Sequence, residues 1–172
     1  MGDHGSRRFE GVIVRTEHWP VVLMEIPERR FTDAALRETL KFHEELMITA
    51  RRAAERVYVI TDLSRMTELA SRSQIAYTGE WLQRRASLQQ ATTLGVATVC
   101  PSVIQRGLLT AIAWFLDRQV PKLWVATRRE ACASALAALD GAGIRLRPEV
   151  TAWLSAEAAP RSGRPSSPPP AR

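Results

Sequence analysis

The run Val57–Thr67, with the sequence VYVITDLSRMT, constrains the fold of this chain most. Its first part is rich in β-branched residues, which predicts a buried strand, and it ends in a polar loop that contains Asp62 and Ser64. Open α/β sheets place their functional residues in loops of this kind. The run therefore predicts an α/β fold and the location of a site, although it does not indicate a chemistry.

β-prone and helical segments alternate along the rest of the chain. Strands are predicted at Gly11–Arg15, Val21–Ile26, Arg56–Asp62, Thr93–Cys100 and Leu123–Thr127. Helices are predicted from Thr32 or Asp33 to Ala54, from Ser73 to Gln90, from Ser102 to Arg118 and from Thr127 to Asp140.

This order of elements predicts the topology. The first two strands form an antiparallel hairpin, and single helices then join strands that must lie parallel. We predict an α/β fold with a mixed, mostly parallel five-stranded sheet and four covering helices, in the order β-β-α-β-α-β-α-β-α.

The start of the last helix has a specific signal. Thr127–Glu130 matches the capping box, and Gly141 or Gly143 is positioned to take the left-handed conformation after the helix. Arg128 and Arg129 stand at the helix N-terminus, where positive charge is unfavourable unless an acid or a bound anion such as phosphate compensates it.

We predict one globular domain with short flanking segments. Residues 1–8 are expected to be a flexible N-terminus, 9–147 the domain, 148–159 a C-terminal extension, and 160–172 a disordered tail of Pro, Ser and Arg. No apolar run approaches the roughly 20 residues of a membrane span, and no signal-peptide pattern opens the chain. We therefore expect a cytoplasmic protein without membrane insertion.

The net charge of +6 and the pI near 10.3 raise the question of nucleic-acid binding. Of the 24 basic residues 22 are Arg, three of which lie in the tail, and the five Arg-Arg pairs occupy different elements. We expect solvated faces there and do not expect nucleic acid as the main partner.

Catalytic and metal-binding patterns are missing from the sequence. The three histidines do not cluster, and His43 stands on the apolar stripe of a helix, where a hydrogen-bonded core histidine is the expected role. Cys100 and Cys132 are far apart and are expected to be small buried hydrophobes. We expect no enzymatic activity, no cofactor and no metal.

The order of elements and the segment DLSRM after the third predicted strand resemble the STAS domains, in particular the SpoIIAA-like bacterial relatives of anti-sigma-factor antagonists. The resemblance covers residues 9–147 and implies binding of a protein partner, such as an anti-sigma factor or a kinase, through this loop and the following helix. The implied partner-binding residues are Asp62, Ser64, Thr67, Ser71 and Ser73.

In the antagonists, a serine in an Asp-Ser-Ser-Gly segment is phosphorylated to break binding. That segment is not intact here, and Ser71 and Ser73 are the nearest equivalents and the candidate phosphorylation sites. Both serines also have a local explanation as helix N-caps, and Asp62 with Ser64 has one as a turn that closes the strand.

The helix predicted from Ser102 is apolar all round over Gly107–Leu116, apart from Thr110. Its surplus apolar surface is covered either by the segment around Trp153 and Leu154 or by a second chain. A homodimer is thus one prediction, with an interface at Leu109, Ile112, Trp114 and Phe115.

Together these observations predict a non-enzymatic regulatory or scaffolding protein that binds a protein partner. Two alternatives stay open, a module that binds a small ligand or lipid and a weak nucleic-acid binder.

Overall fold

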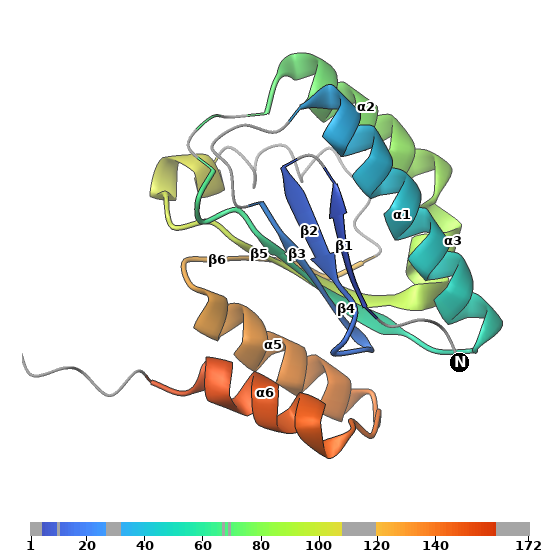
Figure 1. Cartoon of the computed structure of the whole chain (residues 1–172), viewed down its shortest axis with the longest axis vertical. Helices are drawn as coiled ribbons and strands as arrows, with labels where there is room; N and C mark the ends of the chain where they lie inside the picture. The colour runs from blue at the N-terminus through green and yellow to red at the C-terminus, as the bar shows by residue number, and fades with distance from the viewer. Residues whose placement is uncertain are drawn as a thin grey trace, which may run out of the picture.

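In the computed structural model, which describes residues 5–9, 11–26, 32–66, 68, 70–107 and 120–160, one mixed sheet lies between two helical layers (Figure 1). Its six strands lie in sequence order and are β1 Ser6–Phe9, β2 Val12–Arg15, β3 Val21–Glu25, β4 Val57–Asp62, β5 Thr93–Val99 and β6 Lys122–Val125. The pairs β1–β2 and β2–β3 are antiparallel, and β3 to β6 are parallel. The α/β class predicted from the sequence is confirmed.

The helices of the two layers are α1 Asp33–Arg52, α2 Arg72–Arg84, α3 Ala86–Thr92, α5 Arg128–Gly141 and α6 Pro148–Ala158. Residues 103–107 are also helical. Figure 1 shows α1, α2 and α3 on one face of the sheet and α5 with α6 on the other. The candidate interface residues Leu109, Ile112, Trp114 and Phe115 lie outside the described residues.

The prediction of five strands is wrong, because Ser6–Phe9 pairs with β2 as a sixth strand. From the sequence, most of this segment is expected to belong to the flexible N-terminus. The strand is polar and largely exposed, so it carries no alternation of apolar residues that would indicate it. It is held by backbone pairing, and both the backbone N and Oγ1 of Thr16 donate to the Gly5 carbonyl, at 3.1 and 2.8 Å.

The helix predicted over residues 73–90 is divided into α2 and α3 at Arg85. The guanidinium of Arg85 lies 2.8 Å from the Glu44 carboxylate of α1. Because no Gly or Pro marks this point in the sequence, the apolar spacing predicts one continuous helix.

The core between the sheet and the α5–α6 layer includes the C-terminal segment. Val150 and Leu154 of α6 are fully buried among residues of α5 and the sheet. Residues 144–147 form no strand and lead directly into α6. Gly143 takes the expected left-handed conformation, with φ of 67°.

An irregularity in β5 decides which side chains face which layer. The register with β4 shifts so that Val57 pairs with Thr93 and Tyr58 with Gly95, which leaves Leu94 as an extra residue. A Cβ on Gly95 would lie 3.0 Å from the ring of Tyr58, so the close packing favours glycine there. Leu94 thus packs toward α5 and α6, while Thr93 faces the layer of α1 to α3.

Candidate functional site

The polar loop after β4 begins with a local turn. The backbone N–H of Ser64 donates to Asp62 Oδ1 at 2.9 Å, which is the turn that the sequence offers as the local explanation of these two residues. Asp62 and Ser64 are thereby held together at the carboxyl end of β4.

The serines farther along this loop begin helix α2. Ser71 is its N-cap in a full capping box, in which Ser71 Oγ accepts from Gln74 N at 3.2 Å and Gln74 Oε1 accepts from Ser71 N at 2.9 Å. The hydroxyls of Ser71 and Ser73 share a hydrogen bond of 2.8 Å. Gln74 Nε2 also donates to Asp33 Oδ1 at 2.9 Å, which ties α2 to α1.

The structure thus gives these residues local roles, and partner binding or phosphorylation at this loop stays a prediction. Thr67, the fifth candidate residue, lies outside the described residues. Ser71 and Ser73 border the cavity described below, whereas Asp62 and Ser64 do not.

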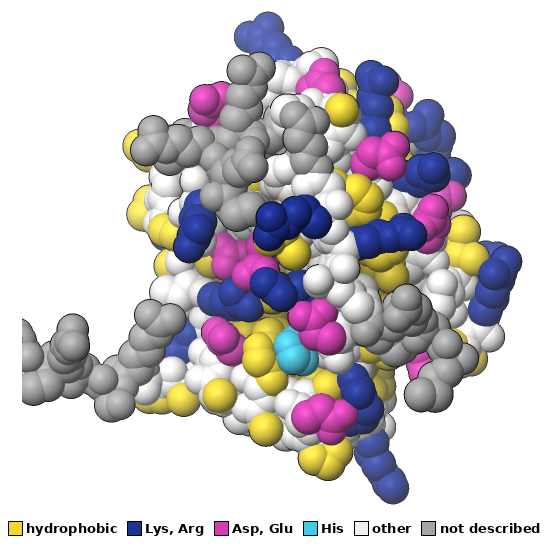
Figure 2. Space-filling view, in the orientation of Figure 1, with side chains coloured by type: hydrophobic (Ala, Val, Ile, Leu, Met, Phe, Trp, Pro, Cys, Tyr) yellow, Lys and Arg dark blue, Asp and Glu magenta, His cyan; other side chains and the backbone are white. Residues whose placement is uncertain are grey.

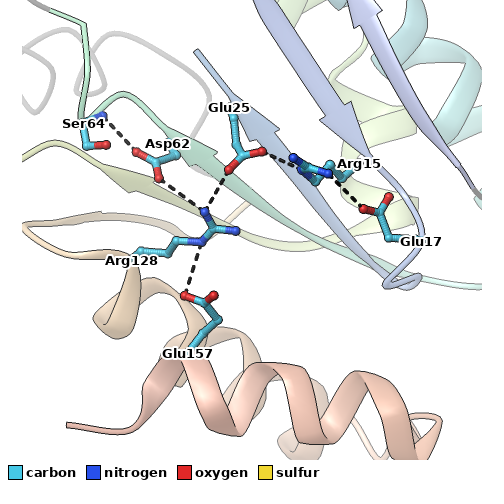
Figure 3. A network of polar contacts seen from close by, with 7 residues as sticks. All are labelled: Arg15, Glu17, Glu25, Asp62, Ser64, Arg128 and Glu157. Carbon is cyan, nitrogen blue, oxygen red and sulfur yellow. Dashed lines mark hydrogen bonds and ion pairs between the residues drawn. The ribbon is translucent and has the colours of Figure 1, made fainter. Parts of the chain in front are cut away.

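The acids expected to compensate Arg128 are present on the α5–α6 face of the sheet (Figure 3). Glu25 and Asp62 are direct neighbours on the parallel strands β3 and β4, an arrangement that is unfavourable for two carboxylates. Arg128 Nη1 lies 2.8 Å from Glu25 Oε1 and 4.0 Å from Asp62 Oδ2, and Nε lies 3.6 Å from Glu157 of α6. Arg15 Nε donates to Glu25 Oε2 at 2.6 Å.

This cluster connects β2, β3 and β4 with α5 and α6. Burial opposes ionisation of Glu25, but the hydrogen bonds and charges of Arg15 and Arg128 outweigh it and hold the pKa of Glu25 below its usual value. At the start of α5, Thr127 Oγ1 accepts from Glu130 N at 3.3 Å, while Glu130 Oε2 accepts from Ala126 N rather than from Thr127. The ion pairs of Arg128 thus have a structural role, because they link strands β3 and β4 to helices α5 and α6.

The two cysteines have the surroundings of inert thiols. Both are buried and free, and burial raises the pKa of Cys132 to about 11 and also raises that of Cys100.

Within the described ranges, no group of three His, Cys, Asp or Glu side chains could hold a metal ion, and no helix is long and apolar enough to cross a membrane.

On the face of the molecule in Figure 2, basic and acidic side chains are interspersed. The described part of this face therefore presents mixed charge rather than a separate basic patch.

The opposite face of the sheet from the Arg128 cluster borders a cavity of about 700 Å³, within the range of small-molecule sites. Among the described residues, its floor is formed by strands β3 to β6 and its walls by α1, α2, α3 and the loop after β4. The apolar lining residues include Met24, Val59 and Val96 from the sheet, Leu36, Leu40 and Trp81 from the helices, and Leu63 and Met66 from the loop.

Three buried polar atoms in the cavity lining have no hydrogen-bond partner among the described residues. They are Thr39 Oγ1 and His43 Nε2 on α1, and Thr93 Oγ1 on β5. Thr39 is 2% exposed and Thr93 3% exposed, so bulk water does not satisfy these hydroxyls. Such groups are rare in folded proteins and each requires an explanation.

His43 differs from the hydrogen-bonded core histidine that the sequence predicts, because its Nε2 atom is unpartnered. Its ring lies 5.6 Å from that of Trp81, measured between centroids. Burial lowers the pKa of His43 to about 4, so the imidazole is uncharged at neutral pH.

The sequence does not predict the cavity, although it contains one signal for it. Thr39 stands four residues before His43, so two polar side chains lie on the apolar face of one helix. Thr93 gives no comparable signal, because its orientation depends on the irregularity in β5.

Comparison with protein-family models, curated proteins and solved structures finds no match for this chain. The function is therefore inferred from the geometry of the cavity.

Proposed function

We propose that this protein is a binding module that holds a small, largely apolar ligand non-covalently in the cavity between the sheet and helices α1 to α3. The observation that carries the proposal is the coincidence of three unpartnered buried polar atoms with the lining of one ligand-sized apolar cavity. This corresponds to the ligand-binding alternative from the sequence.

The energetics of the lining support the proposal. A buried polar group without a partner costs roughly 1–3 kcal/mol, and apolar walls that face empty space lose dispersion contacts. A ligand that supplies hydrogen bonds to Thr39, His43 or Thr93 and fills the space beside Trp81 offsets both costs. The position is also favourable, because the loop at the carboxyl end of β4 contributes Leu63 and Met66 to the lining.

Titration with a neutral solvatochromic dye such as Nile red tests the proposal. We expect the dye to bind with one saturable site, and we expect Thr78→Trp, which places an indole into the cavity from α2, to weaken its binding about tenfold or more. The reason is that the indole takes up space that the dye needs.

Ala76→Trp is the matched control, because Ala76 is exposed on the same helix and does not line the cavity. We expect it to bind dye as the native protein does. Equal dye binding by both variants would place the dye on the outer surface and refute the proposal.

Regulation of a protein partner through the loop from Asp62 to Ser73 is the second candidate. It is favoured by one observation, namely that Ser71 and Ser73 are exposed at the start of α2 and border the same cavity. Affinity capture with the native chain and with Thr78→Trp separates the two functions, because only ligand binding requires an open cavity.

A further inference from the structure

Thr39 and His43 form a two-point polar site on one wall of the cavity. They stand four residues apart on α1, so their Cβ atoms lie about 5–6 Å apart on the same helical face. Thr39 Oγ1 and His43 Nε2 are both buried without a partner among the described residues, and apolar lining residues such as Leu36 and Leu40 flank them on α1. Two unsatisfied hydrogen-bonding groups thus lie in the wall of a mostly apolar space.

The charged residues in the described part of the cavity lining are Asp33, Glu68 and Lys122. Asp33 and Glu68 are exposed, and Asp33 already accepts a hydrogen bond from Gln74. Lys122 is half-buried and belongs to β6, at the opposite edge of the sheet from β1, against which α1 packs. His43 itself is uncharged near pH 7, so neither member of the pair offers a counter-ion to a charged group.

We propose that the ligand is an uncharged, mainly hydrocarbon molecule whose hydroxyl or carbonyl group binds between Thr39 and His43, in the manner of a long-chain alcohol rather than a fatty-acid carboxylate. The inference rests on the proposed function and specifies its ligand class. A carboxylate buried beside uncharged partners loses far more hydration free energy than an alcohol does. An alcohol hydroxyl both donates and accepts, so it complements a threonine hydroxyl and either tautomer of a neutral imidazole.

Displacement of bound Nile red at pH 7.5 by decan-1-ol and by decanoate tests this inference on the full chain. We expect decan-1-ol to displace the dye at a concentration at least about tenfold lower than decanoate, because the carboxylate remains ionised at this pH. Thr39→Val removes the hydroxyl with little change in shape and should weaken decan-1-ol about fivefold.

Two further variants complete the design. His43→Leu should also weaken decan-1-ol, whereas Thr49→Val should not, because Thr49 is exposed on the same helix and its hydroxyl donates to the Glu45 carbonyl. Circular dichroism checks that each variant is folded.

The outcomes separate this inference from the function on which it rests. If decanoate displaces the dye as well as decan-1-ol does, the ligand class is wrong while the binding function stands. If both Thr39→Val and His43→Leu keep native affinity for decan-1-ol, the polar site is wrongly assigned. If the native protein binds no dye, the proposed function fails and this inference fails with it.

Discussion

Replacement of Leu154 by alanine is expected to lower the free energy of unfolding by about 3–4 kcal/mol. The side chain is 0% exposed and packs among buried residues of α5 and the sheet, so its removal leaves a cavity that the neighbouring helix and strands cannot easily fill. Urea denaturation followed by circular dichroism measures the change. A loss of this size makes α6 an integral part of the domain rather than an extension.

Ser155→Ala is the control for this prediction, because Ser155 is the exposed neighbour of Leu154 on the same helix. We expect it to change stability by less than about 0.5 kcal/mol. A Leu154→Ala protein as stable as the Ser155→Ala protein would show that α6 does not contribute to the core as described.

Replacement of Arg128 by methionine is expected to lower the free energy of unfolding by about 2–3 kcal/mol at pH 7, below the values for fully buried pairs because Arg128 is partly exposed. Methionine retains much of the packing but leaves Glu25 and Asp62 as adjacent carboxylates on neighbouring strands. Arg129→Met is the matched control, since Arg129 is the exposed next residue of α5, and it should have a much smaller effect.

The effect of Arg128→Met should depend on pH in a defined direction. The pKa of Glu25 is lowered in the folded protein, so its contribution to stability is present above the ordinary value of 4.5 and is lost as the pH falls through the lowered folded value. The difference between the native and variant proteins is therefore largest at neutral pH and shrinks in acid, as the Glu25 carboxylate becomes protonated. A difference that does not change between pH 7 and pH 3 would contradict the ion-pair account.

Periodicity predicted the parts of the fold that carry a strong apolar pattern. The hairpin and the parallel strands follow from β-branched runs such as the one before Asp62, and α5 follows from its cap at Thr127. The apolar pattern of the sequence does not indicate β1, because most of its residues are polar and backbone hydrogen bonds pair it with β2. The division at Arg85 is not indicated by the sequence, because no Gly or Pro stands at that point.

The sequence likewise indicates one part of the candidate site, whereas the other part depends on the fold. The need for acids near Arg128 is a local consequence of its place at a helix N-terminus, and the sequence indicated it, but only the fold could supply Glu25, Asp62 and Glu157. The cavity depends on how far the helical layer stands from the sheet, and no local pattern encodes that separation. The resemblance to STAS domains pointed to the loop after β4, which the fold places beside this cavity.

A crystal structure determined under xenon pressure tests whether the cavity is open to a ligand, because xenon binds in apolar cavities that water does not fill. We expect xenon between the helices and the sheet, near Val59, Trp81 and Val96, in the native protein, and its loss from that position in Thr78→Trp. A structure in which protein side chains fill this space, with no xenon bound there, would contradict it.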